Sequence, residues 1–582
     1  MPRIDEMPEY RAKHGRTTHD LSHKFGFTAS VAHLLPVFHD FLQAGETVDL
    51  SFKYNLRTQP LASAAMVDIS SHVEYFFVPI NLLYEPFGNY FYDINDNYSS
   101  MYPHVPMGLP LLDFDDMVDE ALSDPTIVYG FDHCTAHQYR LMDMLGYNVV
   151  NYSNGSGGSG IWNPKVFPYP ILAYNCIYQY YYRLDTRQTF DQASFNWDKF
   201  YSTSVVDHLV WDTKYFRLYY RPKASDYFTD IKVSPIVDVL NANVQTSLPV
   251  VNDWLSRGNN SVGNVLTSGG TGSSSAPWSG APNNSNSPVP SMTIQTQFGF
   301  SAHSTFGSSV SPLNGADINT ANIRAIFANE KLYSISGRAR KHYDDQVLAH
   351  LGYKVPHDPK HEISVFGHDR GKIHIGEVIS TADTANAGLG EIAGKGYGSL
   401  SADSHLFTAP CHGVVMAILS FEPDVTYGQT YLKSNALASS NDIPVPEFYY
   451  LGCQPLFGYE AMPDQVATRY DILGWQYRYE QWKRRYNRLT SAFTGLGSLD
   501  SWMLDFRPEN GLLQTNAAAT ENYLGFLHTP SELNQIMLVN YSDNVGSYPE
   551  KVYDGDPFVV DGYVFCKKVS TMPDYSLPRL DA

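Results

Sequence analysis

Hydrophobic and polar side chains alternate most clearly over residues 47–56. Polar residues there fill the positions between five apolar ones, which are Val48, Leu50, Phe52, Tyr54 and Leu56. A period of two over ten residues predicts a β-strand with one face buried and the other face in water.

A second run, residues 72–79, is more uniformly apolar and stops at Pro79, as expected of a core strand. Further strands are predicted at residues 214–220, 372–379, 414–421 and 563–569. These strands are spread over the whole chain, with long and irregular connections between them. An α/β fold alternates strand and helix regularly, and a hairpin meander uses short turns. The wide spacing therefore favours a mainly β fold of the jelly-roll type.

Two helices are predicted between the strands. The first begins at Asn319 or Thr320, either of which can cap it, and apolar residues follow at helical spacing as far as Leu332. The second ends at Gly352, a residue suited to the position just after a helix.

Residues 256–290 consist mainly of Ser, Gly, Asn and Pro, with almost no apolar periodicity. Such a composition is typical of a flexible linker or of an exposed loop tip. The strand pattern continues on both sides of the segment. We therefore expect an insertion that loops out of one domain.

The charge balance limits the classes of function. With 60 Asp and Glu against 40 Lys and Arg, the formal net charge is -20, which argues against a main surface that binds nucleic acid. The five cysteines lie far apart without a Cys-X-X-Cys pair, so neither a disulfide framework nor a zinc site is expected. No run approaches the roughly 18 apolar residues of a membrane span, and the N-terminus lacks the apolar core of a signal peptide. We expect a soluble protein, made in a reducing cytoplasm and not inserted in a membrane.

Candidate catalytic groups are few. His133, Cys134 and His137 resemble a ligand cluster, but nothing nearby completes a tetrahedral set. The acidic stretch at residues 113–120 offers a pair of carboxylates for glycoside chemistry, although such clusters are usually solvated helix faces. We therefore predict no catalytic residue, metal or cofactor, and no enzymatic activity. The alternative is a carbohydrate-binding or glycoside-processing β-sandwich protein.

Residues 475–488 interleave aromatic side chains with five basic residues and a single acid. Single-stranded nucleic acid is bound in this manner, with cations on phosphates and rings against bases. A buried contact between subunits is the alternative, because Arg and aromatic residues are enriched there too. Both interpretations stay open. The candidate DNA-binding residues are Trp482, Lys483, Arg484, Arg485, Tyr486 and Arg488.

Short sequence blocks follow one another in a specific order along most of the chain. The blocks lie at residues 21–23, 35–37, 45–57, 75–79, 173–178, 226–229, 322–332, 351–352, 377–378, 393–394, 477–479 and 499–502. No single block is diagnostic, but in their shared order they resemble the major capsid proteins of the microviruses, especially the gokushovirus branch.

The resemblance implies an eight-stranded antiparallel jelly roll of the viral capsid type, with long loop insertions and a few helices. We expect an N-terminal arm at residues 1–30 and a single jelly-roll domain at residues 31–582, with residues 232–319 as a surface protrusion. The implied function is a T=1 icosahedral shell around the circular single-stranded DNA genome of a phage. The subunit would be located in the virion and assembled in the host cytoplasm.

The resemblance also implies partners. An acidic shell cannot neutralise a packaged genome by itself, so we expect a small basic DNA-packaging protein beside other virion proteins. An exposed loop is free to vary and to touch a host surface. We therefore hypothesise that residues 256–290 contact a host cell-surface receptor, with Trp278 as the anchor. A passive crown is the alternative.

Overall fold

The computed structural model describes the chain in segments, which fall into two compact units. The first unit comprises Met1–Pro235, Lys341–Leu348 and Tyr353–Ala582, and the second comprises Ile236–Arg340 and Ala349–Gly352. The described residues are 15–87, 112–113, 136–147, 165–185, 188–197, 218–232, 266–267, 292–295, 301–304, 320–340, 342–379, 392–428, 430–437, 442–450, 452–461, 472–494, 497–506, 526–539 and 555–574.

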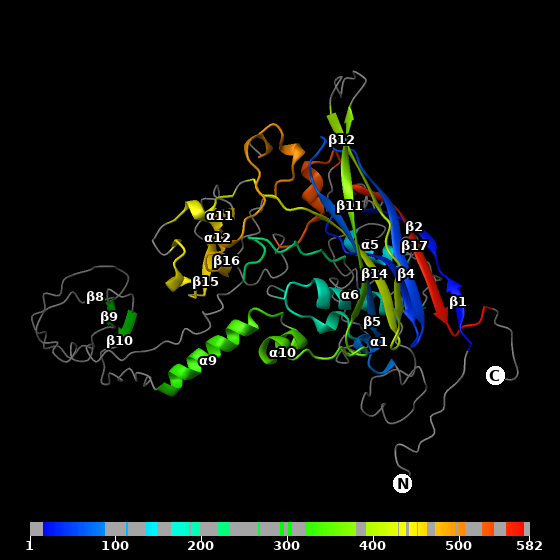
Figure 1. Cartoon of the computed structure of the whole chain (residues 1–582), viewed down its shortest axis with the longest axis horizontal. Coiled ribbons are helices and arrows are strands. Elements are labelled where there is room, and N and C mark those ends of the chain that lie inside the picture. Colours follow the sequence, from blue (N-terminus) through cyan, green and yellow to red (C-terminus); the bar gives the residue numbers. More distant parts are fainter. Residues whose placement is uncertain are drawn as a thin grey trace, which may run out of the picture. The chain divides into compact units, whose positions relative to one another are not determined.

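Ten antiparallel strands join in one curled sheet in the first unit (Figure 1). The strands are β1 (Thr17–Asp20), β2 (His23–Ala29), β3 (Leu35–Leu42), β4 (Thr47–Thr58), β5 (Ile69–Pro79), β11 (Ser364–Ile379), β12 (Ile392–Leu400), β13 (His405–Thr408), β14 (Gly413–Pro423) and β17 (Phe558–Ser570).

The pairing divides this sheet into two layers of four strands. One layer has the order β2-β17-β4-β12 and the other has the order β3-β14-β5-β11, and the pairing of β11 with β12 joins them. In this arrangement each layer alternates strands from distant parts of the chain, as a jelly roll does. β13 pairs with the first part of β4, and β12 pairs with its later part. β1 pairs with the end of β17, after the part that pairs with β2. The predicted antiparallel jelly roll is confirmed.

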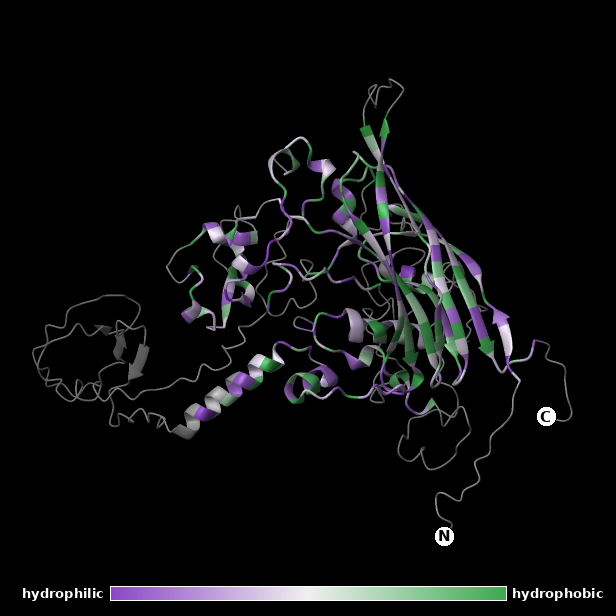
Figure 2. Ribbon diagram, in the orientation of Figure 1, coloured by the Kyte–Doolittle hydropathy of each residue, from purple (hydrophilic) through white to green (hydrophobic). Residues whose placement is uncertain are grey.

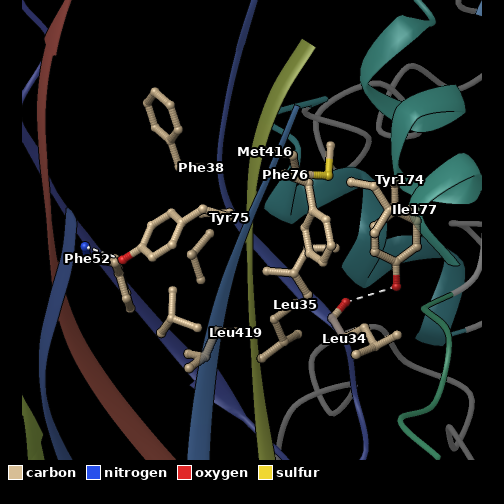
Figure 3. Close-up of a cluster of buried hydrophobic side chains, with 14 of the residues drawn as sticks. Leu34, Leu35, Phe38, Phe52, Tyr75, Phe76, Tyr174, Ile177, Met416 and Leu419 are labelled. Atoms are coloured by element: carbon tan, nitrogen blue, oxygen red, sulfur yellow. Dashed lines mark hydrogen bonds between the residues drawn. The ribbon is translucent and has the colours of Figure 1, made fainter. Parts of the chain in front are cut away.

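Aromatic side chains fill the space between the two layers. The ring of Phe421 on β14 contacts that of Phe558 on β17, with centroids 4.7 Å apart. The backbone N–H of Phe52 donates a hydrogen bond of 2.9 Å to the hydroxyl of Tyr75, which reaches across from β5 (Figure 3). These contacts bury the inward face of both layers.

Burial alternates on β4 but not on β5. The five apolar positions that predicted β4 are all buried, and its outward side chains from Lys53 onward are exposed. β5 is buried on both faces, because its outward Phe76 packs against Tyr181 and Tyr182, with ring centroids 5.0 and 6.1 Å apart. Figure 3 shows Phe76 and Tyr75 on opposite sides of the strand. Figure 2 shows hydrophobic and hydrophilic residues alternating along the strands that end the sheet on its β1 side.

A helix with a short π-helical extension covers the outer face of β5 and β14. It comprises α6 (Tyr169–Ile177) and the following turn at Tyr178–Tyr182. The hydroxyl of Tyr174 donates to the carbonyl of Leu34 over 2.9 Å, which ties α6 to the segment before β3. The remaining helices and strands of the first unit are α1 (Ile80–Leu83), α5 (Ala136–Met144), α11 (Gly458–Ala461), α12 (Glu480–Lys483), β6 (Leu112–Asp113), β7 (Lys165–Val166), β15 (Cys453–Phe457) and β16 (Ile472–Tyr477).

The second unit holds a three-stranded antiparallel sheet, ordered β10-β9-β8, and helix α9 (Thr320–Ser336). Its strands are β8 (Leu266–Thr267), β9 (Met292–Gln295) and β10 (Ser301–Ser304). The predicted helix from residue 319 or 320 is confirmed as α9.

The second predicted helix is α10 (Tyr343–Leu351), and Gly352 follows it with a φ of +67°, as a left-handed cap requires.

One predicted strand, residues 214–220, lies largely outside the described residues. Of the described residues 218–220, Tyr220 pairs through an isolated bridge to His33. The other predicted strands correspond to β4, β5, β11, β14 and β17. None of the helices in the described segments is long and apolar enough to span a membrane.

Candidate nucleic-acid interface

The basic aromatic segment at residues 475–488 folds as a strand, a helical turn and an extended stretch. β16 pairs with β15 in an antiparallel hairpin, and α12 follows two residues later. Tyr479 stands between them as a buried residue with a φ of +64°, in the left-handed region. A left-handed tyrosine is costly and needs support from its surroundings.

Buried amide side chains provide that support. The backbone N–H of Tyr479 donates a 3.0 Å hydrogen bond to the Oε1 of Gln454, on the neighbouring strand β15. The Nε2 of Gln454 in turn donates to the Oε1 of Gln481 over 2.6 Å. The buried side of the helical turn is therefore fixed by these hydrogen bonds, and its other side, with Trp482 and Lys483, is exposed.

Tyr486 points into the protein. Its ring packs against those of Phe228 and Tyr227, with centroids 4.7 and 5.4 Å apart, beside a small hydrophobic cluster that also contains Tyr427. Burial raises the pKa of the Tyr486 hydroxyl. Its ring faces are occupied by protein side chains, so Tyr486 anchors the segment and is poorly placed for base stacking.

Arg484 is paired with two acidic side chains. Its guanidinium lies 2.7 Å from Asp230 Oδ2 and 2.8 Å from Glu480 Oε1. The hydrogen bond that Arg484 donates to Asp230 raises the pKa of Arg484 above its ordinary value. Local carboxylates thus balance this cation, which leaves less of its charge for a phosphate.

The other four candidates are exposed. Trp482 is 46% exposed, and its indole N–H donates to the carbonyl of Asp442 over 3.3 Å. The ammonium of Lys483 donates to the carbonyl of Arg478 over 2.7 Å. The remaining two, Arg485 and Arg488, are also exposed.

A second segment, residues 442–450, lies against α12 and was missed by sequence reasoning. The ring of Tyr449 lies 6.0 Å from that of Tyr479, and Tyr450 is 94% exposed. The guanidinium of Arg478 lies over the ring of Phe448 at 6.0 Å. The run of three aromatics just after Pro446 is visible in the sequence, but nothing local indicates that it joins α12.

A separate group of charged side chains lines a pocket on the outer side of β5 and β14. The guanidinium of Arg221 lies 3.1 Å from Glu74 Oε2 and 3.6 Å from Glu422 Oε2. The hydroxyl of Tyr182 also donates to Glu74. Burial raises the pKa of Glu74, but the charge and hydrogen bond of Arg221, together with Tyr182 and His72, outweigh burial and hold this pKa below its usual range. These carboxylates are therefore ionised and already bonded by protein groups. The pocket is lined by Glu74, Phe76, Tyr181, Tyr182, Arg221, Pro222, Ala224 and Glu422.

Histidines extend this charged network. Buried His528 lies 2.8 Å from Glu532 Oε2 and 3.5 Å from Glu422 Oε1. Burial lowers the pKa of His528, but Glu532 and Glu422 outweigh it and raise the pKa above its ordinary value. Lys223 Nζ lies 3.4 Å from Glu532, and His72 Nε2 lies 3.3 Å from Glu422. The network ties residues 218–232 and 526–539 to the sheet.

The other sequence-based candidates lie largely outside the described residues. This holds for Trp278, for His133 and Cys134, and for the acidic stretch at residues 113–120 apart from Asp113. Within the described segments, no group of three His, Cys, Asp or Glu side chains is arranged to hold a metal ion.

Comparison with known proteins identifies the family. The model of the family described as capsid protein (F protein) matches residues 10–545, which is most of the chain of 582. The chain belongs to this phage capsid protein family. The capsid protein VP1 of Chlamydia phage 1 is 23% identical over 643 aligned positions, which cover 99% of this chain and 97% of that protein.

Membership in the capsid protein (F protein) family makes the chain a structural subunit of a virion that assembles with copies of itself into a shell. The resemblance to microvirus major capsid proteins, predicted from the ordered sequence blocks, is confirmed.

Proposed function

We propose that the chain is the subunit of a T=1 icosahedral shell that encloses a circular single-stranded DNA genome. The family membership and the end-to-end alignment with a phage capsid protein carry this proposal. The jelly-roll wall supplies a rigid subunit, and long connections between its strands supply surfaces for neighbouring copies. The subunit would assemble in the host cytoplasm together with other virion proteins.

The acidic net charge of -20 supports a separate neutralising partner. A packaged strand carries one negative charge per nucleotide, and an acidic shell adds to the repulsion. A small basic DNA-packaging protein would relieve it. The peptide and polyamine content of purified particles tests this point. Full particles that hold DNA without any basic peptide or polyamine would contradict it.

Within this function, we assign the exposed part of the basic aromatic segment to DNA contact. Trp482 and Tyr450 offer rings, while Lys483, Arg485 and Arg488 offer charges on an ordered base. Aromatic rings beside cations suit the bases and phosphates of a single strand. Arg484 and Tyr486 hold the segment to the protein and serve as its supports.

Charge reversal tests this assignment. A triple variant with Lys483→Glu, Arg485→Glu and Arg488→Glu is expected to lower the DNA content of particles. The matched control reverses three exposed lysines elsewhere, Lys331→Glu, Lys354→Glu and Lys360→Glu. Both variants change the net charge equally, so general repulsion cancels. Fully packaged particles from the first variant, measured by density and by absorbance ratio, would rule out the assignment.

Host attachment is proposed for residues 256–290, with Trp278 as the receptor contact. The proposal is supported by a composition typical of an exposed loop. Deletion of the segment is expected to abolish adsorption to host cells while particles still form. Intact particles that adsorb normally would leave the segment as a passive crown.

A further inference from the structure

The outer face of the β2-β17-β4-β12 layer is open. On β4 the outward side chains Lys53 and Arg57 are exposed. On the neighbouring strands, outward-pointing Tyr397 is 62% exposed and Tyr563 is 42% exposed. Rings and cations thus share one solvent-exposed face of the sheet.

The hydrogen-bond register places these side chains in rows that cross the strands. Neighbouring strands lie about 4.8 Å apart, so side chains in one row are in reach of each other. In each row an aromatic ring stands next to a cation. The two rows are Lys24–Tyr563–Lys53 and Val559–Arg57–Tyr397–His374.

The charge of this face is opposite to that of the whole chain. Two acidic side chains point outward on β2, β17, β4 and β12: Asp561, 3.9 Å from Lys24 Nζ, and Asp49, which is paired in register with Lys567. The basic residues that point outward on or beside the two rows are Lys24, Lys53, Arg57, Lys372, Lys395 and Lys567. A local excess of cations on a chain of net charge -20 is a site for a polyanion.

We infer that this face binds single-stranded nucleic acid, as a second DNA-contacting surface beside the α12 segment. The inference rests on the proposed enclosure of a DNA genome. Bases would stack on Tyr397 and Tyr563, and phosphates would lie on the cations between them. Every base has a π-face, so binding would tolerate any sequence, as packaging requires.

A second copy of this acidic chain is the other partner that the charges fit. An acidic protein surface would satisfy the lysines, but it gives no reason for tyrosine rings to stand between them. Open rings beside cations suit the bases and phosphates of a single strand, and this favours nucleic acid as the occupant.

Binding of the full-length chain to a short oligothymidylate, followed by fluorescence anisotropy over a range of salt, tests the inference. The charge variant is Lys53→Ala with Arg57→Ala and Lys395→Ala. It is expected to weaken binding at least tenfold and to reduce the salt slope by about 2, since each phosphate contact on a single strand contributes about 0.7. The ring variant, Tyr397→Ser with Tyr563→Ser, is expected to weaken binding about tenfold or more at an unchanged salt slope.

Two controls separate the possible outcomes. Tyr397→Phe with Tyr563→Phe keeps the rings and is expected to bind like the parent chain. The triple variant Lys483→Ala, Arg485→Ala, Arg488→Ala probes the α12 segment in the same assay. If the parent chain binds the oligonucleotide and both sheet variants match it, this inference is wrong and the proposed function stands.

The DNA content and the assembly of particles distinguish the remaining outcomes. If the parent particles contain no DNA, the proposed enclosure itself is wrong. If the charge variant binds DNA normally but no longer assembles, the face contacts a neighbouring copy and the inference is overturned. Equal thermal melting of all variants is expected, because the substituted side chains are exposed.

Discussion

In both layers of the jelly roll, successive side chains of a strand point inward and outward in turn, but the outward side chains are exposed in one layer and buried in the other. In β4 from Lys53 onward and in β17 from Val559 to Tyr563 every second side chain is exposed, while β5 and β14 are buried on both faces. The difference comes from the connections. The long insertion after β5 supplies α6, which covers one layer and leaves the other open. A jelly roll can therefore dedicate one layer to folding and the other to a ligand.

The covered layer also carries polar groups that burial makes expensive. Glu74, Glu422 and Arg221 lie on or against its outer face and are sealed by the insertions. Buried charges persist only when they are paired and hydrogen-bonded. The outward lysines of the open layer need no such network, because water solvates them. The charged network therefore marks the place where insertions dock on the wall.

The largest expected effect separates the layers by stability. Phe421→Ala removes a ring that packs against Phe558 and Tyr54 between the layers. Loss of a buried aromatic ring is expected to lower the free energy of unfolding by about 4 kcal/mol. Tyr397→Ala on the open face is the matched control, expected to cost less than about 0.5 kcal/mol. Chemical denaturation of the unassembled subunit measures both. Similar losses in the two variants would contradict the comparison.

A smaller effect depends on pH. The raised pKa of His528 means that its charged form stabilises the fold fully below about pH 6.5, and this contribution is lost as the pH rises through the folded-state pKa. The lowered pKa of Glu422 and of Glu532 acts in the other direction. Their contribution is present above about pH 4.5 and is lost as the pH falls. Stability of the subunit is therefore expected to be highest between these limits.

His528→Gln tests the alkaline side of this profile. At pH 6 the variant is expected to lose about 2 kcal/mol, the usual contribution of a hydrogen bond to a charged group. Its melting temperature is then expected to change less between pH 6 and 9 than that of the parent. Melting curves of the unassembled subunit across this range measure the difference. A parent chain that melts at one temperature throughout would rule out the role of His528.

The alternation of apolar and polar residues predicted those strands that bury ordinary apolar side chains on their inward face. β4 was predicted because its inward side is apolar and its outward side is polar. β12 was not predicted from the local pattern, because Gly394 and Gly396 stand at its inward positions in place of apolar side chains. An added Cβ there would collide with the carbonyl of Ser63 and with the side chain of Thr58. Those neighbours lie far away in sequence, so the need for glycine is visible only in the folded chain.

The same limit applies to the basic aromatic segment. Its composition was compatible with nucleic-acid binding and with a buried contact. In the structure, some of its residues are exposed and others are bound to protein side chains. Arg484 is paired because Asp230 reaches it from about 250 residues away, and Tyr486 packs on Phe228 from the same region. The open sheet face was missed as well. Its cations are dispersed over five strands, and only the register brings them together.

The smallest expected effect distinguishes two neighbours in that segment. Arg484→Gln breaks the ion pairs to Asp230 and Glu480, but the pair with Asp230 is nearly half exposed on both sides and screened by water. The loss in stability is therefore expected to stay below about 1 kcal/mol. DNA content of particles is expected to remain unchanged, because local acids already balance this charge. Lys483→Gln is the matched control, with unchanged stability and reduced DNA content. If the two variants exchange these outcomes, Arg484 and not Lys483 holds the phosphate, and its acidic partners release it on packaging.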